Sequence, residues 1–275
     1  MPPRERPGAR NRPGRIRRFV LRYGWRAYAV PLLTIATVAV LLDLALSSPA
    51  TRAAGVGDAA APTASTPAPA LDSGATPPAE GDAGPSQAPQ VVGEETYVEV
   101  GEGPLSVVDG SSQVYGSGPL QRFIVEVEDG IGVDGPGFAA AVEATLSDPR
   151  SWGNGGRMSF QRVGAAEAAA GQFEFKVSLV SPGHMETYCP GVGTGGYTSC
   201  RYADRAVINL ARWATAVPDY AGDIATYRLY VVNHEVGHVL GNGHQPCPGA
   251  GQLAPVMQQQ TLGLQGCAKN AWPYP

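Results

Sequence analysis

Apolar residues recur at every second position in several short stretches after residue 95, which predicts a β-sheet. The clearest stretch is Arg122 to Glu128, where Phe123, Val125 and Val127 mark one face of a strand. Related patterns predict further strands at 158–163, 173–180 and 206–210. Two shorter strand-like pieces are expected to form a hairpin at the domain edge, at 97–100 and 105–108.

Two other stretches carry the periodicity of helices. An alanine-rich helix is predicted at about 138–146, ending at Asp148-Pro149. A longer helix is predicted from about Asp223 to Leu240, and its apolar residues form stripes on two sides, so we expect it to be buried. The order strand, helix, strands, helix predicts an α+β fold in which a twisted mixed sheet packs on the long helix.

The first 95 residues follow a different pattern. An arginine-rich head at 1–26 precedes an apolar run at 27–46, which predicts one transmembrane helix with its N-terminus in the cytoplasm. Small residues at Ser48-Pro49-Ala50 leave a cleaved signal peptide as the alternative. Residues 47–95 are rich in Ala, Pro, Ser and Thr and predict a disordered linker. The folded domain is therefore expected at 96–275, outside the cytoplasm, either membrane-anchored or secreted.

Charge is distributed unevenly between these regions. Nine of the 20 basic residues lie in the first 28 positions, so the rest of the chain is acidic, and its lysines are Lys176 and Lys269 alone. Binding to nucleic acid needs clustered basic side chains, so nucleic acid is excluded as a partner of the folded domain.

All four cysteines fall in the predicted exported domain, where an even number favours disulfides. Three pairings are possible. Proximity in sequence favours Cys189 with Cys200, and Cys247 with Cys267.

Three of the four histidines lie in one eleven-residue stretch. His234 and His238 are four residues apart, so on a helix they project from one face and can bind one metal ion. Glu235 can reach a metal-bound water without ligating the metal, which is the position of a general base. Gly241 suits the end of a helix because it tolerates positive φ. His244 then supplies a third imidazole, and a fourth position stays open for water, as in catalytic zinc sites. The alternative is three ordinary histidines at a helix end.

This stretch, HEVGHVLGNGH, resembles the HExxHxxGxxH motif of the metzincin clan of zinc peptidases. Clan members carry a methionine turn after the motif, and Met257 in Pro255-Val256-Met257 matches it. The resemblance implies a zincin-like fold, Zn²⁺ held by the three histidines and a methionine that packs under the site. The wider layout is also similar to exported actinobacterial zincin-like domains without an assigned substrate.

These features together predict an exported, membrane-anchored zinc-dependent endopeptidase that acts on peptides or proteins outside the cytoplasm. Two other functions stay open. One is a zinc-holding binding module at the cell surface without catalytic activity, against which the presence of Glu235 argues. The other is a hydrolase of cell-wall peptide amides, which uses the same chemistry.

Overall fold

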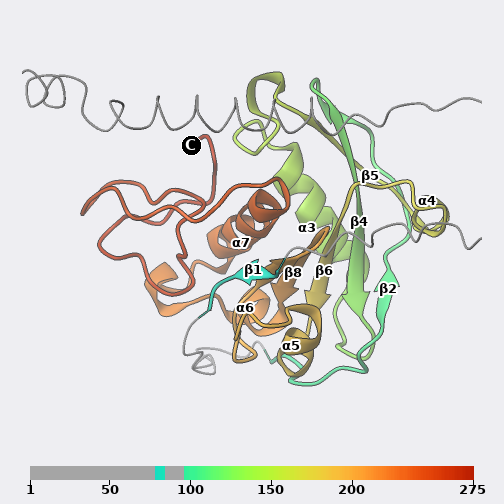
Figure 1. The fold of residues 1–275 in the computed structure, drawn as a ribbon, viewed down its shortest axis with the longest axis horizontal. Coiled ribbons are helices and arrows are strands. Elements are labelled where there is room, and N and C mark those ends of the chain that lie inside the picture. Colours follow the sequence, from blue (N-terminus) through green and yellow to red (C-terminus); the bar gives the residue numbers. More distant parts are fainter. Residues whose placement is uncertain (1–77, 84–95) are drawn as a thin grey trace, which may run out of the picture. The chain divides into compact units, whose positions relative to one another are not determined.

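An eight-stranded mixed sheet forms the centre of the computed structural model, which describes residues 78–83 and 96–275 (Figure 1). The strands are β1 (Glu80–Gly81), β2 (Leu105–Val107), β3 (Tyr115–Gly116), β4 (Leu120–Glu128), β5 (Ser159–Arg162), β6 (Phe175–Val180), β7 (Cys200–Tyr202) and β8 (Arg205–Asn209). Their order is β1-β7-β8-β6-β4-β5-β3, and β2 pairs with the last residues of β4. The four central strands, β8, β6, β4 and β5, run parallel, whereas the remaining pairs are antiparallel.

Short and long helices connect these strands. The α-helices are α3 (Gly135–Ser147), α4 (Ala165–Ala169), α5 (Met185–Tyr188), α6 (Leu210–Thr215) and α7 (Ile224–Val239). Single turns of 3₁₀ helix lie at Asn154–Gly156, Pro182–His184 and Pro218–Tyr220. The described residues thus have a mixed α/β architecture, and the predicted long helix is confirmed as α7.

The main core lies between one face of the sheet and the helices α3 and α7, which contact each other. Alternate residues of the central strands supply the sheet side of this core: Phe123, Val125, Val177, Leu179, Ala206 and Ile208. A smaller cluster lies on the opposite face, where Val180 and Val207 pack on Met185 of α5. Buried residues of the C-terminal part, Val256, Met257 and Ala271, belong to the main core as well, so α7 packs against both the sheet and this part of the chain.

The predicted strands at 122–128, 158–163, 173–180 and 206–210 correspond to β4, β5, β6 and β8. The predicted hairpin between 97–100 and 105–108 is wrong. The first of these segments has no ladder partner in the described residues and instead bonds to loops, since the Glu99 carbonyl accepts from the amide of Gly183. The second forms β2 and pairs with β4. Leu210, expected to end a strand, begins α6 because the side chain of Asn209 caps that helix.

The N-terminal predictions are only partly covered. In the described part of the chain no helix has the length and apolarity needed to cross a bilayer, and the head at 1–26 and the predicted span at 27–46 lie outside that part.

Most of the predicted linker, 47–95, also lies outside the described residues, but at 78–83 the expectation of disorder is wrong. Strand β1 pairs there with Arg201 and Cys200 of β7. Edge pairing uses backbone groups and needs no large apolar side chain, which is why composition alone did not indicate it.

Candidate metal centre

Helix α7 carries the first two histidines of the motif. Its N-terminus is capped by Asp223, whose carboxylate accepts a hydrogen bond from the amide of Thr226 at 3.1 Å. Two turns further on, the helix becomes fully buried, and His234 and His238 are only 1% and 2% exposed. The fold of α7 therefore places both imidazoles inside the protein, on one face of a rigid element.

Backbone carbonyls orient both rings in the same way. Nδ1 of His234 lies 2.8 Å from the carbonyl oxygen of Val256, and Nδ1 of His238 lies 2.9 Å from that of Asn242. A carbonyl can only accept, so each Nδ1 carries the proton and each Nε2 presents a lone pair. Support of this kind from a backbone carbonyl is usual for histidines that bind metals.

The chain turns sharply after α7 and brings back the third histidine. Gly241 has φ of 87°, in the left-handed region, and its amide donates to the carbonyl of His238 at 3.0 Å. Nε2 of His244 then lies 3.0 Å from Nε2 of His238, which in turn is 3.2 Å from Nε2 of His234. Ligands at tetrahedral angles and about 2.05 Å from one zinc ion are about 3.3 Å apart. The predicted triad is brought together at a spacing that fits one metal ion.

Burial keeps the two helical imidazoles neutral. It lowers the pKa of His234 to about 3 and that of His238 to about 3, and in both cases a neighbouring imidazole lowers the pKa further. Neutral imidazole is the form that ligates metals, so these ligands are available over the whole physiological pH range. The side chain of His244 is 33% exposed, so the centre opens to solvent on that side.

Glu235 lies beside the triad and is 1% exposed. Neither of its carboxylate oxygens has a hydrogen-bond partner among the described residues. Burial raises the pKa of this carboxyl well above its ordinary value, and the nearby carboxylate of Asp82 raises it further. An unpartnered buried carboxyl is costly, so its presence beside three converging imidazoles fits a site that takes a cation and a polar substrate.

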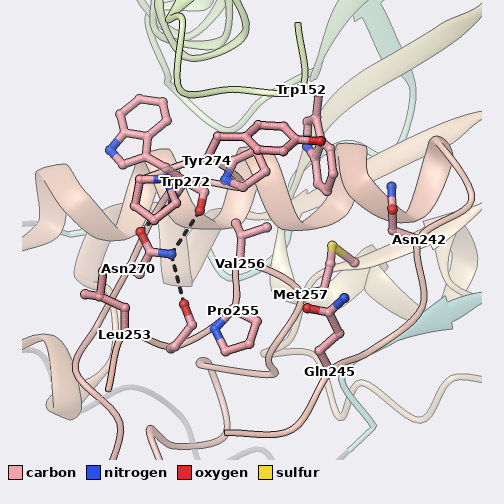
Figure 2. A pocket seen from close by; sticks show the side chains of 13 residues that line it. Trp152, Asn242, Gln245, Leu253, Pro255, Val256, Met257, Asn270, Trp272 and Tyr274 are labelled. Atoms are coloured by element: carbon pink, nitrogen blue, oxygen red, sulfur yellow. Dashed lines mark hydrogen bonds between the residues drawn. The ribbon is translucent and has the colours of Figure 1, made fainter. Parts of the chain in front are cut away.

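Met257 packs under the metal-binding end of α7. A Cβ atom added at Gly237 would overlap its Sδ atom, so the methionine touches the helix between the two helical ligands. Figure 2 shows Met257 beside Val256 on the wall of a pocket of about 350 Å³ that Trp152 and Trp272 also line. The three histidines are not among the residues that line this pocket. It is therefore not the place where a metal held by the triad would sit.

The cysteines form the two pairs that proximity favoured, Cys189 with Cys200 and Cys247 with Cys267. The first bond ties the end of α5 to strand β7. The second closes the loop that carries Met257 and begins three residues after His244. Both disulfides therefore hold segments that border the metal centre.

Two further residues contribute to the site without having been predicted. The side chain of Asn233, buried next to His234, accepts from Ser151 at 2.7 Å and donates to the carbonyl of Ala271 at 2.9 Å. Asp82 lies with its Oδ1 atom 3.9 Å from Nε2 of His234 and 3.7 Å from that of His244. Asp82 belongs to no recognisable motif, because it lies in a stretch of low complexity. The one local signal is its neighbour Gly81, since glycine is typical of positions where the backbone comes close to another strand.

The chemistry of the donor set is clear from these residues. Three imidazoles suit a divalent transition metal such as zinc, copper, iron or nickel better than magnesium or calcium, which prefer oxygen ligands. The residues present thus fit a transition-metal ion, with a carboxylate at its side.

Comparison with known proteins adds a family but no activity. No curated protein and no solved structure matches the chain significantly. One family model matches residues 92–275, which is more than half of the chain and includes α7 and the three histidines. The chain therefore belongs to the family described as "Protein of unknown function (DUF3152)".

Proposed function

We propose that the domain from residue 96 to 275 is a zinc-dependent endopeptidase that works outside the cytoplasm. One observation carries the proposal: three Nε2 atoms converge at 3.0 and 3.2 Å beside a buried carboxylate that has no partner among the described residues. A purely structural zinc site needs no such carboxylate, because its four ligands complete the site.

Each side chain has a definite task in this proposal. His234, His238 and His244 would hold the ion, which when bound supplies a Lewis acid that polarises the scissile carbonyl and acidifies the attacking water. Glu235 accepts the proton of that water and delivers it to the leaving amine. Burial raises the pKa of Glu235 and so favours the protonated form, which is the form that delivers a proton to the leaving amine.

The sheet offers a place for an extended substrate. Strand β7 contacts α7, and in the described conformation its outer edge pairs with the two-residue strand β1, so this edge becomes available to a peptide when β1 leaves it. A peptide in extended conformation would pair with this edge by backbone hydrogen bonds, in the manner of an added strand. Cleavage within a chain, rather than at its end, follows from such binding.

Two observations support the proposed location outside the cytoplasm and the attachment to the membrane. The two disulfides support an oxidising location. The apolar run at 27–46 supports attachment to the membrane with the domain outside, or secretion after cleavage.

The test compares the full chain with Glu235→Gln and His238→Ala on a library of peptides, with and without a chelator. Glu235→Gln should keep its zinc and lose at least ~10²-fold in cleavage rate, because a general base contributes ~10²- to 10⁴-fold. His238→Ala should lose zinc, whereas His184→Ala, a histidine outside the triad that contacts Glu128, should keep it.

Each contrary result has a distinct meaning. Zinc binding without cleavage of any peptide would favour the inactive binding module. Cleavage of cell-wall peptides alone would favour the amide hydrolase. Unchanged cleavage by Glu235→Gln would remove the assigned general base.

A further inference from the structure

Residues 79–83 lie on the sheet edge that the proposed substrate would use. Gly81 comes so close to β7 that a Cβ atom on it would be 2.6 Å from Cβ of Cys200, so only glycine fits at this position. Glu80 forms an ion pair with Arg201 of β7 at 2.8 Å. The hydroxyl of Thr198 donates to the carbonyl of Asp82 at 2.5 Å. Contacts on both sides of Gly81 thus fix the segment on this edge.

The segment also forms part of the cleft at the metal centre. A hollow of about 350 Å³ has one wall made of Ala79, Glu80, Gly81 and Ala83. His238 and His244 line the same hollow, together with Val192. The segment therefore lies across the side on which the centre opens to solvent.

The carboxylate of Asp82 is the part of the segment that enters the centre. It is 1% exposed, and its Oδ1 atom has no hydrogen-bond partner among the described residues. Its distances to the Nε2 atoms of His244 and His234, 3.7 and 3.9 Å, are slightly longer than the roughly 3.3 Å that separates two ligands of one tetrahedral zinc ion. The oxygen thus lies close enough to the triad to reach an ion held there with a small shift of the side chain.

Charge balance supports the same assignment. Asp82 and Glu235 are both buried beside the histidine triad. Two carboxyl groups in such a place repel each other when ionised. The Asp82 carboxyl is hydrogen-bonded by the side chains of Gln259 and Thr261, and a divalent cation on the triad would attract both carboxyl groups and give the Oδ1 atom of Asp82 the partner that it lacks.

We propose that Asp82 is a fourth protein ligand of the metal held by the histidine triad, and that residues 79–83 thereby block the centre from within the same chain. A substrate needs the edge of β7 and the metal position that this segment takes, so the two exclude each other. The described conformation is then a latent one, and displacement of the segment opens the centre. The ligand assignment rests on the triad, and the statement about latency rests on the proposed peptidase function.

The test measures the zinc dissociation constant of the full chain by competition with a coloured chelator. Asp82→Asn and Asp82→Ala should raise this constant at least ~10-fold, because each removes an oxygen ligand. The control, Glu80→Gln, removes the same charge from the same segment, from a side chain that is 51% exposed, paired with Arg201 and near Nδ1 of His238 at 3.7 Å, not near the Nε2 atoms that face the metal position. It should change the constant by less than about 5-fold, since exposed ion pairs are weak.

A second readout reports coordination directly. With cobalt(II) in place of zinc, the visible absorption spectrum should change in Asp82→Asn and stay as in the parent in Glu80→Gln. Thermal unfolding in the presence of a chelator checks that the variants remain folded.

The results separate the ligand from the peptidase. A raised zinc constant with faster peptide cleavage by Asp82→Asn supports both proposals. A raised constant without cleavage by any form keeps Asp82 as a ligand and removes the peptidase. A zinc constant and a cobalt spectrum unchanged in both Asp82 variants overturn the inference, whether or not peptides are cleaved.

Discussion

Gly237 gives the sharpest test of how the metal centre is packed. It lies in α7 between Glu235 and His238, and the structure leaves no room for a side chain there. A Cβ atom at this position would overlap Sδ of Met257 and would be 2.7 Å from Cζ2 of Trp152. Contacts between non-bonded heavy atoms are normally about 3.5–4.0 Å, so Gly237→Ala forces both neighbours to move.

Two opposing terms decide the size of the effect. Alanine inside a helix is favoured over glycine by about 1 kcal/mol. Overpacking a closed core costs about 1–3 kcal/mol. Displacement of the neighbours is difficult because Met257 is 2% exposed and the indole of Trp152 donates to the Asn233 carbonyl at 2.9 Å. We therefore expect the overpacking cost to lie at about 2–3 kcal/mol, the upper part of its range, so that Gly237→Ala lowers the free energy of unfolding by about 1–2 kcal/mol net.

A double-mutant cycle with Met257→Ala isolates this contact. Met257→Ala alone should cost about 2–5 kcal/mol, as for other large side chains removed from cores. In that background Gly237→Ala meets only the indole of Trp152, so its cost should fall by at least about 1 kcal/mol and its sign can reverse. The assay is urea unfolding of the four forms with a chelator present, so that metal binding does not contribute. Equal effects of Gly237→Ala in the two backgrounds would refute the close contact between helix and methionine.

Three shorter predictions concern the surroundings of the site. His238→Ala should abolish stoichiometric zinc binding, measured by elemental analysis, because a triad reduced to two imidazoles loses a ligand from its rigid helix. Loss of the Cys247–Cys267 disulfide, in a variant with serine at both positions, should speed zinc release to a chelator more than loss of the other disulfide, and equal release rates would contradict this. Asp223→Ala should cost about 1 kcal/mol of stability as a lost N-cap, and Asp223→Asn less. The contact with Lys269 lowers the pKa of Asp223 to about 2 from 3.8. The stability that the Asp223 carboxylate contributes is therefore fully present above pH 3.8 and is lost as the pH falls toward 2. If the difference in unfolding free energy between the parent and Asp223→Asn stayed constant over this pH range, the assignment would be contradicted.

The histidine triad could be predicted from the sequence because its residues lie close together in the chain. His234 and His238 share a helix, and Gly241 is three residues beyond His238, so helix geometry alone brings these groups into register. The alternation in β4 likewise predicted which residues face the core, since a strand has a strict period of two.

Other parts depend on partners that the sequence does not mark. The segment at 97–100 has the pattern of a strand, yet only the fold decides whether a partner strand is available. In the structure this segment bonds to a loop, where the amide of Gly183 donates to the carbonyl of Glu99. Asp82 lies far from the motif in sequence and among small residues, and its approach to His244 depends on how β1 pairs with β7. A short strand that is held by backbone hydrogen bonds needs no alternation of apolar residues, so the sequence pattern does not predict it.

The two outermost strands of the sheet, β1 and β3, have two residues each. Long, flat edge strands act as templates on which other chains add themselves and aggregate, and proteins avoid this by ending their sheets in very short strands. If β1 leaves, the three-residue β7 becomes the edge and exposes backbone groups that a second molecule can pair with. Any preparation that lacks residues 78–83 should therefore be checked for self-association before its other properties are compared with those of the full chain.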